Sequence, residues 1–297
     1  MKTLLLGANG QLGRDCLAIL PAGSAVGLDL PDVDVTDAGS LARALDAHRP
    51  DAVVNCAAFT AVDKAESCEE AARAVNAMAP GLLGRECARR GIRVVHISTD
   101  YVFDGLREPP APYVETDVPA PLSAYGRTKR EGEERLLGSG ARAAVLRTAW
   151  LYGAHGRNFP KTMLRLALAH PGRPLRVVDD QWGSPTWSWR LARQIAAVLD
   201  APEFPEGIFH ATAHGFTTWR RFAEAFLRAV GCDVAVEPCS TADYPTPARR
   251  PGNSILENAA LARLGLDAMA DWEEDVATFA ARHRDALLAE ARAAAAP

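Results

Sequence analysis

Tyr125 and Lys129 are the pair in this sequence whose types and spacing best suit acid–base chemistry. Four residues apart on a helix, the two side chains lie on one face. A free phenol has a pKa of about 10 and is a poor acid or base at neutral pH, but a nearby ammonium group favours its phenolate. Tyr-x-x-x-Lys is a common pattern by itself, because lysines are frequent on helix surfaces, so the pair needs support from elsewhere in the chain.

That support comes from Ser98-Thr99-Asp100, which follows a predicted strand at residues 92–97. Ligands bind beyond the carboxyl ends of the strands in open α/β sheets. A hydroxyl at Thr99 can hydrogen-bond a substrate carbonyl beside the tyrosine. We therefore predict Thr99, Tyr125 and Lys129 as the catalytic group.

A glycine-rich turn, Gly7-Ala8-Asn9-Gly10-Gln11-Leu12-Gly13, follows the first predicted strand and opens a predicted helix. Such glycines allow a tight turn and let a pyrophosphate approach the N–H groups at the helix N-terminus. The first step is one residue longer than in the commonest fingerprint, and a purely structural turn is the alternative. With its context, the turn predicts a dinucleotide cradle.

Asp29 ends the second predicted strand, about 20 residues after the glycines, where an acid can hydrogen-bond an adenosine ribose 2′-hydroxyl. A carboxylate there favours NADH, whereas Arg14 can pair with the 2′-phosphate of NADPH, so both cofactors stay open. Alternatively, Asp29 only begins the turn through Pro31. The small residues of Asn55-Cys56-Ala57-Ala58-Phe59-Thr60 fit either a backbone close to the cofactor or a packed strand end.

Apolar runs of strand length at residues 2–6, 24–28, 51–55, 92–97 and 143–146 alternate with amphipathic stretches. Continuous apolar strands indicate a parallel sheet covered on both faces. Between the third and fourth runs, an apolar stripe predicts one core-packing helix. The predicted fold class is α/β, a Rossmann-like doubly wound parallel sheet with a smaller C-terminal substrate-binding domain. The stripe residues are Cys68, Ala71, Val75, Met78, Leu82 and Cys87.

Tryptophan and proline become frequent after about Gly153, which predicts loops with a fixed backbone. We expect residues 1–153 to form an NAD(P)-binding Rossmann domain and residues 154–297 a discontinuous nucleotide-sugar-binding domain. A strand at 175–178 and a helix at 191–199, within a segment of about 174–200, are expected to return to the sheet.

The composition is that of a globular protein: 297 residues, 48% of them hydrophobic, with 33 basic and 37 acidic side chains. A slightly acidic chain lacks the basic excess of a dedicated nucleic-acid binder. Six irregularly spaced cysteines without a Cys-x-x-Cys pair predict reduced thiols. With no secretory start and no apolar run of ~18 residues, the chain is expected to be cytoplasmic, with no membrane partner.

Together these motifs resemble the extended short-chain dehydrogenase/reductases and, among them, the dTDP-4-dehydrorhamnose reductases. The resemblance spans essentially the whole chain. Its most specific strings are Ser-Thr-Asp-Tyr-Val-Phe-Asp-Gly at 98–105 and Pro-Ala-Arg-Arg-Pro at 247–251.

The resemblance implies reduction of dTDP-4-dehydro-β-L-rhamnose to dTDP-β-L-rhamnose by NADPH or NADH, the last step of an activated deoxysugar pathway. Tyr125 would protonate the C4 oxygen, Lys129 would lower the tyrosine pKa, and Thr99 would orient the carbonyl. The cofactor positions that match the family are Gly10, Gln11, Leu12, Asp29, Asp34, Val35, Ala58, Phe59 and Thr60, next to Gly7 and Gly13 of the turn.

Substrate contacts are expected from Asp100, Trp150 and Asn158, and from Arg249 and Arg250. Trp150 is either a sugar platform or a core aromatic. The two arginines suit a nucleotide diphosphate, because guanidinium binds phosphate bidentately, although adjacent arginines are more commonly a solvated pair.

Some family members bridge their subunits with a magnesium ion held by carboxylates, but here only Asp15 stands where such an acid would lie. Residues 187–189, Trp-Ser-Trp, carry no acid, so we predict no metal. An apolar contact through these tryptophans is the hypothesis for a homodimer.

Two other functions stay open. One is a non-catalytic NADP-binding regulatory subunit, against which the intact Thr99, Tyr125 and Lys129 argue. The other is an epimerase or dehydratase of another nucleotide sugar, which would retain its nucleotide tightly.

Overall fold

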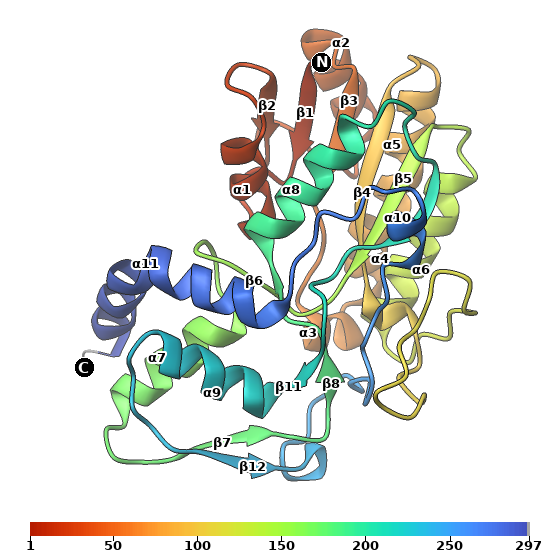
Figure 1. The fold of residues 1–297 in the computed structure, drawn as a ribbon. Helices are drawn as coiled ribbons and strands as arrows, with labels where there is room; N and C mark the ends of the chain where they lie inside the picture. The colour runs from red at the N-terminus through yellow and green to blue at the C-terminus, as the bar shows by residue number, and fades with distance from the viewer. Residues whose placement is uncertain (296–297) are drawn as a thin grey trace.

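A six-stranded parallel sheet, with five strands from the first half of the chain and one from the second, is seen in a computed structural model that describes residues 1–295 (Figure 1). All five strands expected from the apolar runs form and pair in parallel. The strand order reverses beside the first strand, which defines a doubly wound fold. In order across the sheet, the strands are β10 (Gly207–His210), β5 (Ala143–Thr148), β4 (Arg93–Thr99), β3 (Ala52–Asn55), β1 (Thr3–Leu6) and β2 (Ala25–Leu28).

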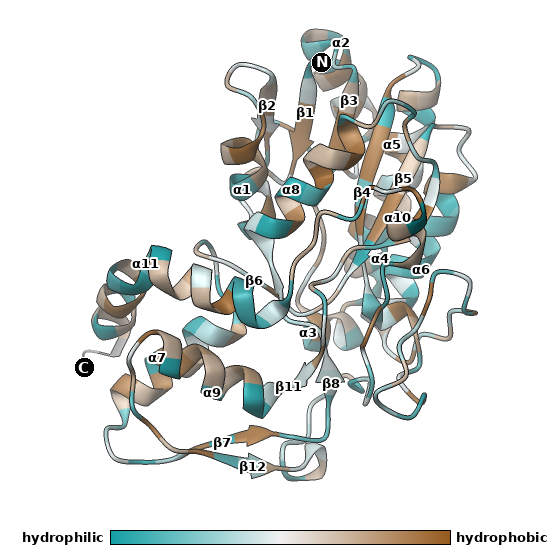
Figure 2. Cartoon of the chain, in the orientation of Figure 1, coloured by the Kyte–Doolittle hydropathy of each residue, from teal (hydrophilic) through white to brown (hydrophobic). Residues whose placement is uncertain are grey.

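Helices bury both faces of this sheet. Leu5 points to the face covered by α1 (Gln11–Ile19) and α8 (Ser188–Leu199), whereas Leu4 and Leu6 point to the face covered by α2 (Ala38–His48), α5 (Ala79–Ala88) and α6 (Ala124–Leu137). Figure 2 shows the consequence, with apolar strands in the centre and polar residues on the outer helices. Burial on both faces explains why the strands are continuous apolar runs.

The helix predicted from the apolar stripe forms, but it is not uniform. It comprises α4 (Glu69–Arg73), a π-helical turn at Ala74–Met78, and α5. The π turn carries the buried Asn76, whose side chain exchanges hydrogen bonds with the backbone N–H (2.8 Å) and C=O (3.1 Å) of Phe59. Local widening of a helix is often found next to functional sites, and here it fixes the segment that follows β3.

A second lobe is built from short strand pairs and three helices around an aromatic core. The strand expected at 175–178 forms as β7 (Leu175–Val178), but it pairs with β12 (Val236–Cys239) in this lobe. That expectation is therefore corrected: α8 returns to the large sheet, and the late strand added to it is β10. The remaining elements of this lobe are β6 (Leu151–Tyr152), α7 (Phe159–Ala169), β8 (Trp182–Gly183), β9 (Thr186–Trp187), β11 (Thr217–Thr218), α9 (Trp219–Ala229) and α11 (Trp272–Ala295). Two short helices, α3 (Val62–Ser67) and α10 (Ala259–Arg263), pack on the sheet domain.

The core of the second lobe contains Trp187, only 2% exposed, packed edge-on against Phe279. Trp187 cannot therefore form the apolar contact between two chains that its sequence suggested. Trp189 is half-buried, and the guanidinium of Arg282 lies over both tryptophan rings. The last two residues of the predicted second domain, 296 and 297, lie outside the described residues.

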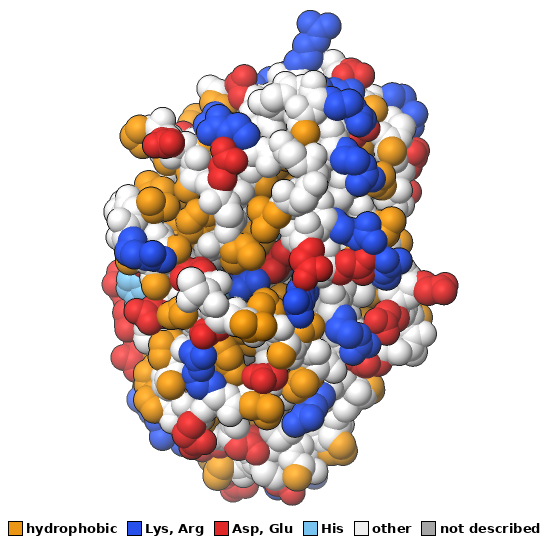
Figure 3. Space-filling view, turned by 90° about the vertical axis from the view of Figure 1, so that its right-hand side faces the viewer, with side chains coloured by type: hydrophobic (Ala, Val, Ile, Leu, Met, Phe, Trp, Pro, Cys, Tyr) orange, Lys and Arg blue, Asp and Glu red, His pale blue; other side chains and the backbone are white. Residues whose placement is uncertain are grey.

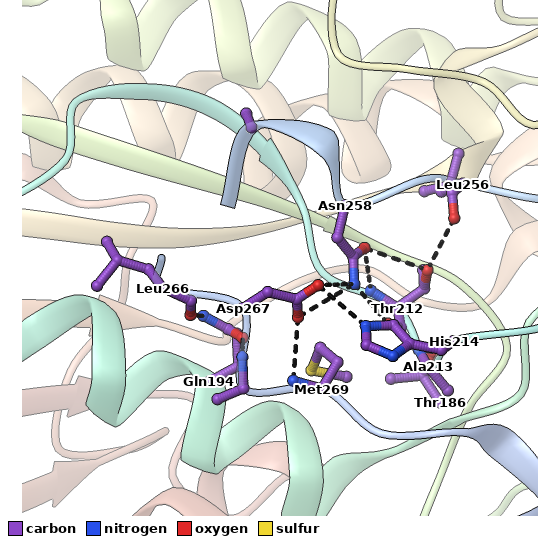
Figure 4. Close-up of polar contacts among 12 residues, drawn as sticks. Thr186, Gln194, Thr212, Ala213, His214, Leu256, Asn258, Leu266, Asp267 and Met269 are labelled. Carbon is purple, nitrogen blue, oxygen red and sulfur yellow. Dashed lines mark hydrogen bonds and ion pairs between the residues drawn. The ribbon is translucent and has the colours of Figure 1, made fainter. Parts of the chain in front are cut away.

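Polar contacts fix the late strand and α8 to the segment that precedes α11 (Figure 4). The carboxylate of Asp267 lies 2.9 Å from His214 Nε2 and accepts from the N–H of Met269. Gln194 of α8 donates to the carbonyl of Leu266 at 2.8 Å, and Asn258 accepts from the N–H of Thr212 at 3.0 Å. These bonds join three segments that are far apart in the sequence.

All six cysteines are free thiols, as the spacing predicted. Among residues 1–295, no helix has both the length and the apolar character needed to cross a bilayer. Acidic and basic side chains are interspersed on the face shown in Figure 3, with hydrophobic side chains gathered between them.

Candidate active site

A cleft of about 800 Å³ lies along the carboxyl ends of the parallel strands. Every residue predicted to bind the cofactor or to act in catalysis lines it, which places segments from five parts of the sequence around one volume. The predicted residues in the lining are Gly7, Gly10, Gln11, Leu12, Gly13, Asp29, Asp34, Val35, Ala58, Phe59, Thr60, Thr99, Asp100, Tyr125, Lys129 and Trp150.

The glycine turn is packed too tightly for a side chain at Gly7 or at Gly13. Gly7 has φ of 77°, and a Cβ there would lie 2.7 Å from the backbone nitrogen of Ala57. A Cβ on Gly13 would lie 2.3 Å from the carbonyl oxygen of Gly7. Helix α1 begins after Gly10 without a side-chain cap. Its first N–H groups therefore face the cleft as donors for an anion, as a pyrophosphate requires.

Asp29 holds the glycine turn in place as well as lining the cleft. Its carboxylate accepts from the N–H of Asn9 at 3.0 Å and of Leu30 at 2.9 Å. Arg14 donates to the carbonyl of Asn9 at 3.2 Å, so it lies near the same corner. The carboxylate of Asp29 and the guanidinium of Arg14 thus both lie at the expected adenosine ribose position, which is called the ribose corner below. The two interpretations of Asp29, as a turn residue and as a ribose ligand, are compatible.

The hydroxyl of Thr99 lies at the end of β4, where it donates to Asp100 Oδ1 at 2.9 Å and accepts from the N–H of Tyr101 at 3.2 Å. Burial raises the pKa of Asp100 to about 6, against the opposing hydrogen bonds from Ser254 and Thr99. The other carboxylate oxygen, Asp100 Oδ2, is buried without a hydrogen-bond partner among the described residues. A buried acceptor of this kind is suited to a ligand hydroxyl.

Tyr125 lies in the first turn of α6, after the capping Ser123, and packs edge-on against Tyr101 with ring centroids 5.5 Å apart. Burial raises the pKa of Tyr125, and the nearby Asp100 raises it further, against an opposing contact with Thr99. The phenol is therefore held in its protonated form. This is the form that can donate a proton to a carbonyl oxygen that becomes an alkoxide.

Lys129 follows one turn later and is almost wholly buried. Its ammonium nitrogen donates to the carbonyl of Ile97 at 2.6 Å and lies 3.3 Å from His96 Nε2. Burial lowers the pKa of Lys129 to about 8, opposed by Glu133 and Cys56. Lys129 is not among the groups that shift the pKa of Tyr125 in this arrangement, and its polar contacts are with residues of β4, so its effect on the tyrosine pKa stays a prediction.

A buried ion pair underlies this catalytic turn. Glu133, one turn beyond Lys129, binds Arg147 of β5 through both carboxylate oxygens, at 3.0 and 2.7 Å, and also accepts from Ser98. Both charged side chains are at most 2% exposed. The pair joins β4, β5 and α6, so it fixes the helix that carries Tyr125 and Lys129.

Trp150 combines the two readings that its sequence left open. It has φ of 48°, lines the cleft, and stacks on Trp219 of the second lobe with ring centroids 3.6 Å apart. A Cβ on Gly183 would lie 2.4 Å from the indole. Trp219 thus supports one ring face of Trp150 and Gly183 lies against its edge, while the indole still lines the cleft.

The remaining predicted substrate residues do not line the cleft. Arg250 donates to the hydroxyl of Tyr101 at 3.0 Å and to Asp63 at 2.7 Å, so both ends of its guanidinium are engaged. Arg249 is exposed. Asn158 caps α7 and donates to Gln11 at 2.7 Å, which connects the second lobe to the glycine turn.

No group of three or more His, Cys, Asp or Glu side chains in residues 1–295 is arranged to hold a metal ion. Asp15, the acid matched to the magnesium site of some relatives, accepts a hydrogen bond from Ser188. Burial raises the pKa of Asp15.

Several residues of the site had no place in the sequence-based prediction: His96, Asn76, Glu133 and Arg147. His96 and Arg147 had a visible signal, since each is a polar residue within an apolar strand. Asn76 and Glu133 had none, because polar residues in helices are usually solvated.

The fold and the site define a nicotinamide-dependent oxidoreductase of the short-chain dehydrogenase/reductase type. The uncapped helix, the glycines without room for Cβ atoms and the ribose corner fit a dinucleotide. The chain belongs to the family described as RmlD substrate binding domain, whose model matches residues 1–284.

Named relatives agree over most of the chain. It is 42% identical to a dTDP-4-dehydrorhamnose reductase of Burkholderia thailandensis, over 92% of this chain and 95% of that one. It is 41% identical to a dTDP-4-keto-6-deoxy-D-glucose reductase of Streptomyces niveus, over 91% and 93%. The crystal structure of a dTDP-4-dehydrorhamnose reductase of Bacillus anthracis in complex with NADP superposes with a TM-score of 0.90 at 33% identity, covering 95% of this chain and all of that one.

Proposed function

We propose that this chain reduces the C4 keto group of dTDP-4-dehydro-β-L-rhamnose to give dTDP-β-L-rhamnose, with NADPH or NADH. The observation that carries the proposal is that Thr99, Tyr125 and Lys129 lie in the same cleft as the glycine turn. A proton donor is thus beside the place where a dinucleotide would end.

Nicotinamide, when bound, supplies a hydride to C4. The protonated phenol of Tyr125 donates its proton to the C4 oxygen, and the hydroxyl of Thr99 turns from Asp100 to the same oxygen. Lys129 binds the nicotinamide ribose. Trp150, supported by Trp219, packs against the sugar, and the free Asp100 oxygen accepts from a sugar hydroxyl.

The 4-keto-6-deoxy-D-glucose sugar named for the Streptomyces niveus relative is a second candidate substrate. It carries the same ketone and the same nucleotide, and differs in the configuration of the ring. Reduction of both sugars at equal concentration, followed by comparison of kcat/KM, ranks the two.

NADPH is the cofactor that we propose first, because Arg14 lies at the ribose corner and the Bacillus anthracis relative binds NADP. NADH is the second candidate cofactor, since the carboxylate of Asp29 suits a free ribose 2′-hydroxyl. We place the reaction in the cytoplasm. The homodimer stays a hypothesis, and sedimentation as a monomer at micromolar concentration contradicts it.

The test is an assay of reduced-nicotinamide absorbance with dTDP-4-dehydrorhamnose. We expect substrate-dependent oxidation of one NADPH or NADH for each sugar reduced. No oxidation with either cofactor contradicts the proposal and favours a regulatory subunit. Sugar conversion without net oxidation, by a protein purified with bound nucleotide, favours an epimerase or dehydratase.

A further inference from the structure

One exposed cation lines the cleft and has no place in the site described so far. Arg157 lies in the segment between β6 and α7, and the other basic side chain of the lining is Lys129. Lys129 is buried, and its ammonium nitrogen donates to the carbonyl of Ile97 at 2.6 Å. Among the lining residues that the structure describes, Arg157 is therefore the cation that an anionic ligand can reach.

The segment that carries Arg157 is fixed against the first residue of α1 (Figure 1). Asn158 Nδ2 donates to Gln11 Oε1 and to the carbonyl of Gly153, both at 2.7 Å. A Cβ on Gly156 would lie 3.8 Å from Gln11 Cβ. Both neighbours of Arg157 in the sequence thus lie close to the end of α1 whose N–H groups have no side-chain cap.

Helix α7 holds the same segment from its other side. Lys161 Nζ donates to the carbonyls of Ala154 at 3.2 Å and Gly156 at 2.9 Å, and it pairs with Glu290 of α11 at 2.7 Å. The backbone on both sides of Arg157 is therefore fixed, whereas its exposed side chain has no hydrogen-bond or ion-pair partner among residues 1–295.

The surroundings of Arg157 do not balance its charge. It directly precedes Asn158, the N-cap of α7, and the helix dipole disfavours a cation at this end of a helix. Arg157 also lines a neighbouring pocket of about 260 Å³, whose other charged residues are Lys161, Arg165 and Glu290. One acid faces three cations there, so the excess positive charge suits an anionic ligand.

We propose that Arg157 binds the pyrophosphate of the nicotinamide dinucleotide, on the side opposite the N–H groups of α1. This inference rests on the proposed function and assigns the cofactor a contact from the second lobe. The N–H groups at one helix end face only part of a pyrophosphate, which has charged oxygens on both phosphoryl groups. A planar guanidinium can donate to two of the remaining oxygens at once.

The test is NADPH binding by Arg157→Gln in the absence of sugar, followed by NADPH fluorescence. We expect the Kd to rise about 10-fold, because a charge-assisted contact at an exposed position is lost. An unchanged Kd overturns the proposal.

Arg165→Gln is the matched control. It removes the same charge about two turns further along α7, from the neighbouring pocket but outside the cleft lining. We expect its Kd for NADPH to stay within about 2-fold of wild type, because solvent and salt screen a charge at that distance. Equal losses in the two variants overturn the proposal, since they would report net charge alone.

Two further ligands test the assignment to the pyrophosphate. Adenosine 2′-monophosphate carries the 2′-phosphate without a pyrophosphate, and we expect it to displace NADPH from Arg157→Gln with its wild-type affinity. A loss as large as that of NADPH would place Arg157 at the ribose corner and overturn the assignment. We also expect the affinity for dTDP, measured by calorimetry, to be unchanged. Weaker dTDP binding with wild-type NADPH binding would assign Arg157 to the substrate and overturn the proposal.

Thermal unfolding without ligand separates binding from folding. We expect the same midpoint for Arg157→Gln and wild type, because the exposed guanidinium has no partner to lose. A lower midpoint contradicts the proposal, since the side chain would then serve the fold. Failure of the proposed function has a different signature: wild type would bind NADPH without reducing the sugar, and the effect of Arg157→Gln on NADPH binding would remain.

Discussion

The two sides of the cleft are built in different ways. On the sheet side, backbone packs on backbone and charges are fully buried, as at Gly13 against Gly7 and at the Glu133–Arg147 pair. On the side of the second lobe, short strand pairs carry stacked rings and partly exposed ion pairs, such as Arg220 with Asp179.

The difference matches what each side must do. A proton donor and a dinucleotide cradle need atoms held within a few tenths of an ångström, which close packing provides. A sugar nucleotide can be bound by side chains that are partly exposed to solvent. We therefore expect substitutions on the sheet side to cost more than equivalent substitutions in the second lobe.

The largest expected effect is on turnover in Tyr125→Phe. Loss of the proton donor lowers kcat by about 10²–10⁴-fold while NADPH still binds. Tyr113→Phe is the control, because its hydroxyl also makes a hydrogen bond, to Asp104, but lies outside the cleft lining. Stopped-flow absorbance and NADPH fluorescence measure the two quantities. Full turnover in Tyr125→Phe would refute its role as the acid.

The next effect is on stability in Glu133→Leu. It leaves the buried guanidinium of Arg147 unpaired, so the free energy of unfolding falls by about 3–5 kcal/mol. Asp179→Leu breaks the corresponding pair of the second lobe, where both partners are more than 20% exposed, and the loss is smaller. Urea unfolding measures both. Equal losses would remove the contrast between the two sides.

A third prediction concerns how the free energy of unfolding changes with pH, which is expected to have opposite signs for Asp100 and Asp179. Burial raises the pKa of Asp100 to about 6, so the folded state binds more protons than the unfolded chain between about pH 4 and 6. The free energy of unfolding therefore falls as pH rises through that window, by up to about 3 kcal/mol.

Asp179 is expected to behave in the opposite way. Burial acts to raise its pKa, but hydrogen bonds from Thr218 and Arg220 outweigh it and the pKa is lowered. Its contribution to stability is present above the unfolded pKa and is lost as pH falls below it. Unfolding at pH 3–7 of Asp100→Asn and Asp179→Asn, each against wild type, measures the two slopes. The same sign for both would contradict the assignment.

The smallest effect is expected for glycine substitutions. Gly13→Ala places a Cβ 2.3 Å from the Gly7 carbonyl oxygen, so we expect a loss of about 1–3 kcal/mol and weaker NADPH binding. Gly252→Ala in the second lobe meets its nearest atom at 3.4 Å, and stability stays within about 0.5 kcal/mol of wild type. Thermal unfolding and NADPH titration compare the two. Wild-type NADPH affinity in Gly13→Ala would contradict the tight-cradle interpretation.

Local sequence was enough to predict the catalytic side of the cleft. Each strand of the large sheet up to β5 is one apolar run, and the residues at its carboxyl end meet at one edge because the strands are parallel. Thr99, Tyr125 and the glycine turn were therefore brought together as expected. The roles assigned to them stay predictions until the variants are measured.

The second lobe was less predictable, because its elements pair with partners far away in the sequence. Residues 175–178 have the pattern of a strand, but only their contact with residues 236–239 shows to which sheet they belong. Arg250 has the chemistry of a phosphate ligand, but its distance to Asp63 and Tyr101 decided what it touches here.

The sequence by itself determined the fold class, the cleft and the identity of its reactive groups, since these follow from periodicity, turn chemistry and residue type. Only the tertiary structure decided their protonation. The pKa of Tyr125 depends on burial and on Asp100, and the pKa of Lys129 depends on burial and on Glu133 and Cys56; the chain brings Asp100 and Cys56 close from other elements. Desolvation is a property of the packed site, and no spacing of residues along the chain encodes it locally.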